Sequence, residues 1–167
     1  MFVLDASTLI LLARAELLAP FLASVKLQAA IPEEVARECC SAKRTLDSLM
    51  IQKALDESRI RLIAVKNRKL VVKLQSDFSL GQGEAEAIAL SLKEGARILG
   101  IDDKNGINAC KLLGIPFTTA MGILLRGREK NLLDRSASLA ALEALAKFGR
   151  YKGSIIEDAR RKLEVPE

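Results

Sequence analysis

Residues 96–118 read ARILGIDDKNGINACKLLGIPFT, and their pattern indicates the type of fold. The apolar run that ends at Ile101 predicts a short buried strand, and KNGINACKLL after the two aspartates predicts a helix. Gly114 follows the last helical residue, as a capping glycine does, and IPFT then predicts a second strand. A strand, a helix and a strand in this order predict two parallel strands joined by a crossover helix.

The rest of the chain continues this alternation. We predict further strands at Phe2–Leu4, Val25–Ile31 and Ile60–Val65. We predict one helix with Ser7 as its N-terminal cap, a second with Pro32 at its first position and a third that begins near Lys43. A further helix is predicted to end at Gly95. The pattern predicts an α/β fold with a mostly parallel central sheet that helices cover on both faces.

The C-terminal part of the chain has a helical pattern without strands. From Ala120 to about Leu163 the apolar residues recur at helical spacing, with a break near Gly149–Gly153. We therefore predict a main domain over residues 1–130 and a helical extension over residues 131–167, packed on the same domain.

Composition restricts the class of protein. The 167 residues suit one domain, and because half are hydrophobic but only 4% are aromatic, the core must be aliphatic. No cationic segment precedes the first apolar run, and Asp5, Arg14 and Glu16 interrupt every span long enough to cross a bilayer. We expect a cytoplasmic protein that does not enter a membrane.

The chain contains no histidine, which excludes histidine-based triads, acid–base pairs and zinc sites. The three cysteines, Cys39, Cys40 and Cys110, include no Cys-x-x-Cys pair and are best explained as small apolar residues. If the protein is an enzyme, carboxylates or lysines must carry its chemistry.

The net charge of +5 favours a polyanionic partner such as nucleic acid. The scarcity of aromatic residues argues against a surface that stacks on bases. A bound nucleic acid would therefore be held mainly through its phosphates.

Residues 80–90, LGQGEAEAIAL, place two glycines before an apolar helical run. A dinucleotide-binding loop would need a buried strand before the first glycine, whereas QSDFS precedes it, and Glu86 occupies the third glycine position, where it would repel a pyrophosphate. The glycines are better explained as delivering Glu84 to the start of a helix.

Carboxylates also follow two predicted strands. Asp5 comes directly after FVL, and Asp102-Asp103 follow RILGI. The functional crevice of an open parallel sheet lies at the carboxyl ends of its strands, and a carboxylate there is costly to desolvate without a partner. Asp5 could instead cap the next helix, and one of the two later aspartates could do the same.

Four stretches in this order, MFVLDASTLI, IPEEVARE, GEAEAIALS and RILGIDDKNG, resemble the acidic motifs of the PIN-domain nucleases, the fold of the VapC-type toxins. The resemblance covers about residues 1–125, and the longer phrases are most similar to a prokaryotic branch of uncharacterised PIN-like proteins. It implies a Rossmann-like three-layer α/β/α sandwich and a nuclease that binds one or two Mg²⁺ or Mn²⁺ ions and cleaves RNA.

The resemblance also implies the site residues. It places the four acidic ligands, which are also the catalytic residues, at Asp5, Glu38, Glu84 and Asp102. Glu86 and Asp103 are alternatives for the last two positions. Glu84 and Glu86 are two residues apart on a helix and so do not share a face.

The chemistry gives this set of residues a reason. Oxygen ligands suit Mg²⁺ and Mn²⁺, and clustered carboxylates are tolerable when a divalent cation offsets their repulsion. We therefore expect metal-dependent hydrolysis of RNA. The family further implies an antitoxin protein and a homodimer as partners, with the C-terminal helical pair as the surface for either.

Two other classes of protein remain alternatives. A phosphoacceptor receiver domain would carry its acidic pair after the first strand, whereas this chain has a single Asp5 there. A catalytically inactive PIN-like protein could use the same fold as a nucleic-acid or protein-binding module.

Overall fold

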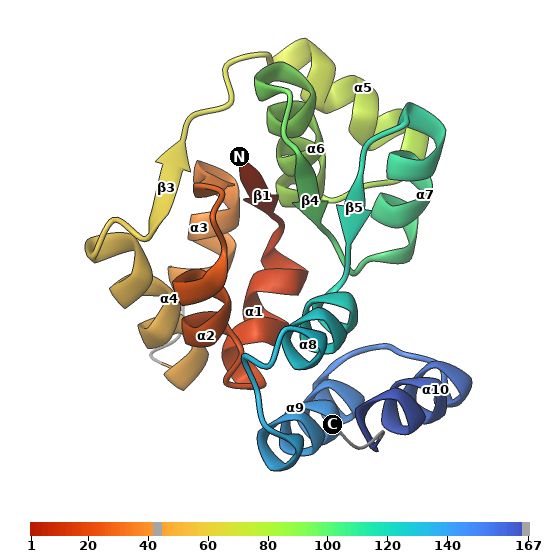
Figure 1. Ribbon diagram of the computed structural model, residues 1–167. Helices are drawn as coiled ribbons and strands as arrows, with labels where there is room; N and C mark the ends of the chain where they lie inside the picture. Colours follow the sequence, from red (N-terminus) through yellow and green to blue (C-terminus); the bar gives the residue numbers. More distant parts are fainter. Residues whose placement is uncertain (42–44, 165–167) are drawn as a thin grey trace.

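In a computed structural model, which describes residues 1–41 and 45–164, the chain folds around a parallel sheet (Figure 1). The strands among these residues are β1 (Phe2–Leu4), β2 (Ala29–Pro32), β3 (Ile60–Ile63), β4 (Ile98–Gly100) and β5 (Phe117–Thr118), in the order β3-β2-β1-β4-β5. Each neighbouring pair is parallel, and in the central pair Phe2 aligns with Ile98 and Leu4 with Gly100. The predicted α/β/α sandwich with a parallel sheet is confirmed.

Helices connect the strands and continue beyond the last one. They are α1 (Ala6–Arg14), α2 (Leu18–Ser24), α3 (Glu33–Cys40), α4 (Leu46–Asp56), α5 (Arg68–Phe78), α6 (Gln82–Glu94), α7 (Lys104–Leu113), α8 (Ala120–Glu129), α9 (Arg135–Phe148) and α10 (Gly153–Glu164). Gly95 and Gly114 end α6 and α7 in the left-handed conformation, as predicted, with φ of 57° and 67°. The predicted break near Gly149–Gly153 separates α9 from α10.

The alternation of side chains along β1 divides the core between the two faces of the sheet. Phe2 and Leu4 belong to an apolar cluster with side chains of α1 to α4 and α8 to α10, whereas Val3 belongs to a second cluster with α5, α6 and α7. Both clusters are mainly aliphatic, as the composition predicts, and Phe2 and Phe21 form an edge-to-face pair with centroids 5.0 Å apart.

The C-terminal helices contribute to the first of these clusters. Leu142 and Leu145 of α9 and Leu163 of α10 are buried in it together with Leu4 and Leu12. In Figure 1 the two helices, in blue, lie beside α8. Residues beyond 130 therefore share a core with the first strand, and the division of the chain at residue 130 stays a prediction.

Several predicted boundaries near the N-terminus are wrong. Asp5 rather than Ser7 caps α1, which ends at Arg14, and the apolar run continues in a separate helix, α2. The predicted strand Val25–Ile31 is shorter at its start, because Val25 is still the C-cap of α2, and β2 includes Pro32, which precedes α3 instead of opening it.

Two other boundaries differ as well. The strand predicted to reach Val65 ends at Ile63. The helix predicted from near Lys43 begins at Leu46 in the structure, and Lys43 itself lies outside the described residues. Among the described residues no single helix is long and apolar enough to cross a membrane. Within the part of the chain that the structure describes, α1 and α2 taken together meet the test of length and composition, but they are bent by 109° relative to each other.

Candidate active site

The central pair of strands, β1 and β4, positions two of the predicted site residues. From β1 the chain builds the sheet outward through β2 and β3, and then returns to the other side of β1 to add β4 and β5. In open parallel sheets such a reversal creates a crevice at the carboxyl ends of the two strands. Asp5 follows β1 directly, Asp102 follows β4 by two residues, and the Asp5 N–H donates to the carbonyl of Gly100 at 3.0 Å.

Asp5 is fully buried and forms the N-terminal cap of α1. Its Oδ1 accepts the Thr8 N–H at 2.8 Å, and its Oδ2 accepts the Ser7 hydroxyl at 2.6 Å. Burial raises the pKa of this carboxyl from 3.8 to about 7, in spite of the opposing hydrogen bonds from Ser7 and Thr8, and the negative charge of Asp102 adds to the increase. A negative charge on Asp5 is therefore unfavourable without a cation nearby.

Asp102 accepts hydrogen bonds from three parts of the chain. Its Oδ2 accepts the Thr8 hydroxyl at 2.7 Å and the Ala120 N–H, at the start of α8, at 2.9 Å. Its Oδ1 accepts the hydroxyl of Tyr151, from the connection between α9 and α10. Because Thr8 donates to Asp5 through its N–H and to Asp102 through its hydroxyl, it joins the two carboxylates, which we call the strand-end pair.

Asp103 has a different role from its neighbour. Its side chain caps α7 and accepts the N–H groups of Asn105 at 2.8 Å and Gly106 at 3.2 Å. One of the two aspartates was predicted to cap a helix, and the geometry assigns this to Asp103 and leaves Asp102 beside Asp5.

Glu38 and Glu84 lie together where α3 packs on α6, and we call them the helix pair. Glu38 Oε1 accepts the Gly83 N–H at 3.1 Å, and Glu84 Oε2 accepts the Gly81 N–H at 3.0 Å, as in a capping box. Burial is the main cause that raises the pKa of both carboxyls above their usual value of 4.5. Neighbouring negative charges add to this, including Glu84 in the case of Glu38 and Asp103 in the case of Glu84.

Glu86, the alternative to Glu84, is already paired with a cation. It is 2% exposed, and its Oε1 lies 2.7 Å from Nη1 of Arg68 and accepts the Gln82 side chain at 3.3 Å. A buried glutamate with an arginine partner serves the packing of α5 on α6. Its negative charge still contributes to the raised pKa of Glu38.

The donor chemistry of these four residues suits Mg²⁺ or Mn²⁺, since every ligand would be a carboxylate oxygen. The side chains are arranged as two pairs, however. In the described part of the chain no three acidic or cysteine side chains converge closely enough to hold a metal ion. The observation in favour of a cation is the strand-end pair itself, in which a fully buried carboxyl has a second one as its neighbour.

Sequence reasoning missed Thr8 and Tyr151. A side chain that caps a helix accepts the backbone N–H two or three residues further on, and Thr8 stands three residues after Asp5. This spacing could have indicated the role of Thr8. Tyr151 gave no local signal, because its contact with Asp102 spans 49 residues.

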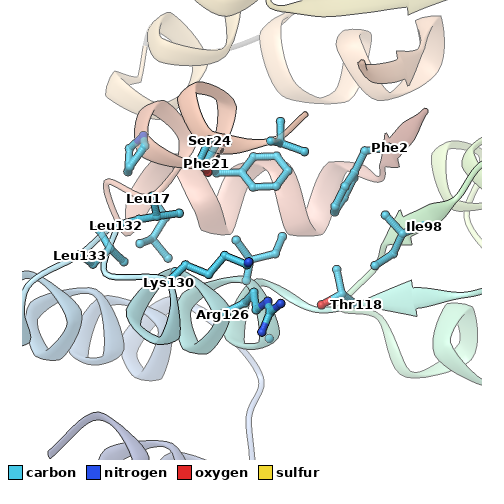
Figure 2. A pocket seen from close by; sticks show the side chains of 15 residues that line it. Phe2, Leu17, Phe21, Ser24, Ile98, Thr118, Arg126, Lys130, Leu132 and Leu133 are labelled. Atoms are coloured by element: carbon cyan, nitrogen blue, oxygen red, sulfur yellow. Dashed lines mark hydrogen bonds between the residues drawn. The ribbon is translucent and has the colours of Figure 1, made fainter. Parts of the chain in front are cut away.

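A separate apolar cavity of about 280 Å³ lies between α2 and α8 (Figure 2). The side chains of Phe2, Phe21 and Ile98 line it, and Arg126 and Lys130 are the charged residues among its lining. None of the four predicted site residues lines this cavity, so it is distinct from the acidic edge of the sheet.

Comparison with known proteins agrees with this fold. A family model described as a PIN domain matches residues 1–164, so the chain belongs to the PIN-domain family. The match extends beyond the resemblance inferred from the sequence, which covers about residues 1–125, and includes α9 and α10. No curated protein and no solved structure matches the chain. The fold is of the nuclease type, and PIN domains typically use divalent metals.

Proposed function

We propose that this protein is a metal-dependent ribonuclease that hydrolyses RNA phosphodiester bonds. The observation that supports it best is the strand-end pair, in which Asp5 is fully buried beside Asp102 at the reversal point of the sheet. Two neighbouring carboxylates repel each other, and the buried one, Asp5, is poorly solvated; a divalent cation would offset both costs. The PIN-domain fold supports the same activity.

Asp5 and Asp102 would hold the ion directly, and Glu38 and Glu84 would hold it through an oxygen or through water. When bound, the ion would position the scissile phosphate, lower the pKa of an attacking water and stabilise the departing oxygen. Thr8 keeps the strand-end pair in register through its two hydrogen bonds, which are 2.8 and 2.7 Å long. The absence of histidine from the sequence is compatible with this chemistry.

The net charge of +5 supports RNA as the polyanionic substrate. The family also supports a role as the toxin of a toxin–antitoxin pair and a homodimeric state, with the C-terminal helices as the surface for the partner. Phe148 and Ile155, which are 43% and 44% exposed, offer apolar area on these helices. A monomer mass in light scattering at micromolar concentration would remove the homodimer from this proposal.

A second candidate function is that of an inactive PIN-like binding module. Two observations favour it: all four carboxylates already accept hydrogen bonds from the protein, and no three acidic side chains converge in the described residues. Such a protein would bind RNA or a protein partner without cleaving it.

The experiment that separates the two functions is an RNA cleavage assay with mixed substrates. The protein is first stripped with a chelator, and Mg²⁺ or Mn²⁺ is then returned. The ribonuclease predicts no cleavage without metal and restored cleavage with either ion. RNA that the protein binds but leaves intact at millimolar Mn²⁺ would favour the binding module. An Asp5→Asn protein prepared in the same way controls for contaminating nucleases.

A further inference from the structure

The connection between α9 and α10 brings a tyrosine to the strand-end pair. The Tyr151 hydroxyl donates to Asp102 Oδ1 and accepts the Met121 N–H at 3.3 Å. A phenol hydroxyl is protonated near neutral pH, so Tyr151 is a hydrogen-bond donor to this carboxylate. Gly149 leaves room for the ring, because a Cβ at that position would lie 2.6 Å from it.

The hydrogen bonds to Asp102 are distributed unequally between its two oxygens. An ionised carboxylate has about two acceptor positions on each oxygen. The Thr8 hydroxyl and the Ala120 N–H use both positions of Oδ2. Oδ1 accepts only Tyr151 among the described residues, and so it is the oxygen with a position left for a cation.

We propose that Tyr151 is a positioning residue of the active site, which fixes Asp102 in an orientation that would leave an acceptor position of Oδ1 available to a metal ion. The inference rests on the proposed function and extends it, since it makes the C-terminal helical pair a part of the site. Without the hydroxyl, Oδ1 has no hydrogen-bond donor in the described part of the chain, and the carboxylate is held through Oδ2 alone.

The first test is Tyr151→Phe, which removes the hydroxyl and keeps the ring. Partners of metal ligands are worth about 10- to 100-fold in metal affinity. We expect Mn²⁺ binding, measured by electron paramagnetic resonance on the full chain, to weaken by about this factor. Arg160→Gln is the matched control, because it breaks an exposed 2.5 Å ion pair with Glu143 in the same helical pair and should leave the affinity unchanged.

The second test uses the unaltered protein and so does not depend on the variant folding. Tyr151 is the only tyrosine, and the chain has no tryptophan, so ultraviolet fluorescence reports on this side chain. Mg²⁺ should change the tyrosine emission over the same concentrations that support cleavage, and Asp102→Asn should abolish the change.

The outcomes separate this inference from the proposed function. Equal Mn²⁺ affinity of the folded Tyr151→Phe protein and the unaltered one, or tyrosine emission that ignores saturating Mg²⁺, would overturn the role of Tyr151 even if RNA is cleaved. Tyrosine-dependent Mn²⁺ binding without cleavage would instead support the role of Tyr151 and contradict the ribonuclease.

Discussion

The strand-end pair and the helix pair are both acidic, but the chain holds them in different ways. Asp5 and Asp102 follow the two central strands, and Thr8 bridges them through a side chain and a backbone group. Glu38 and Glu84 lie on helices, and each accepts a glycine N–H, from Gly83 and Gly81. The first pair is therefore fixed by the sheet, whereas longer side chains give the second more freedom to approach an ion.

The largest effect is expected from Asp5→Asn, which breaks the strand-end pair. Removing a hydrogen-bond partner of a metal ligand typically lowers metal affinity or activity by about 10- to 100-fold. Loss of a ligand itself should therefore reduce RNA cleavage more than about 100-fold. Circular dichroism should show an intact fold, since asparagine can also cap α1. Asp103→Asn is the control, as it changes the cap of α7 and should spare cleavage. Unaltered turnover by the Asp5→Asn protein would count heavily against the ribonuclease.

A smaller effect is expected in the helix pair. Glu38→Gln or Glu84→Gln should lower cleavage by about 10- to 100-fold if these residues act through metal-bound water. Glu86→Gln is the comparison, because that side chain is paired with Arg68 and should affect melting temperature more than cleavage. The distinction between the pairs fails if a glutamate substitution is as damaging as Asp5→Asn.

Gly83→Ala sharpens the comparison without removing a carboxylate. A Cβ at this position would lie 2.4 Å from Glu38 Oε1, so the glutamate must move, while alanine favours the helix by about 1 kcal/mol over glycine. We expect cleavage to fall by about tenfold, which is the lower end of the range for altering a partner of a metal ligand. The melting temperature should not decrease. Gly153→Ala, where the Cβ would meet nothing within 4 Å, serves as the control. Full cleavage by the Gly83→Ala protein would show that the position of Glu38 is unimportant.

The last prediction concerns stability in the absence of metal. The pKa of Asp5 is raised from 3.8 to about 7 in the folded protein, so its stabilising contribution is complete below pH 3.8 and is lost as the pH rises through 7. Asp5→Asn has no such charge. In urea unfolding with a chelator, the variant should match the unaltered protein near pH 4 and exceed it at pH 8, by up to about 4 kcal/mol. A constant difference between the two proteins across this range would contradict the burial effect.

The sequence was sufficient for the sheet and for the acidic residues at its edge. Apolar runs with capping glycines located β4, α7 and β5, and the strand-end position identified Asp5 and the pair Asp102-Asp103. It was insufficient where the chain turns without glycine or proline. The break between α1 and α2 occurs at Glu16, with a φ of 58°, although the helical spacing of the apolar residues continues across it.

Long-range hydrogen bonds were equally inaccessible to sequence reasoning. Motif matching named the four acidic residues, but two of the donors that hold Asp102, Ala120 and Tyr151, depend on how α8 and α9 pack. For the same reason the arrangement as two pairs could not be read from the spacing of the motifs, which fixes only the order of the residues along the chain.

The way Asp102 is held also affects the order in which the molecule is completed. Its donors Thr8 and Tyr151 stand 94 residues before it and 49 residues after it, so both contacts require large loops to close. During synthesis a chain that has emerged only as far as α8 carries both aspartates but lacks the phenol that holds one of them. A chain at that stage would therefore hold Asp102 through fewer donors than the folded protein does.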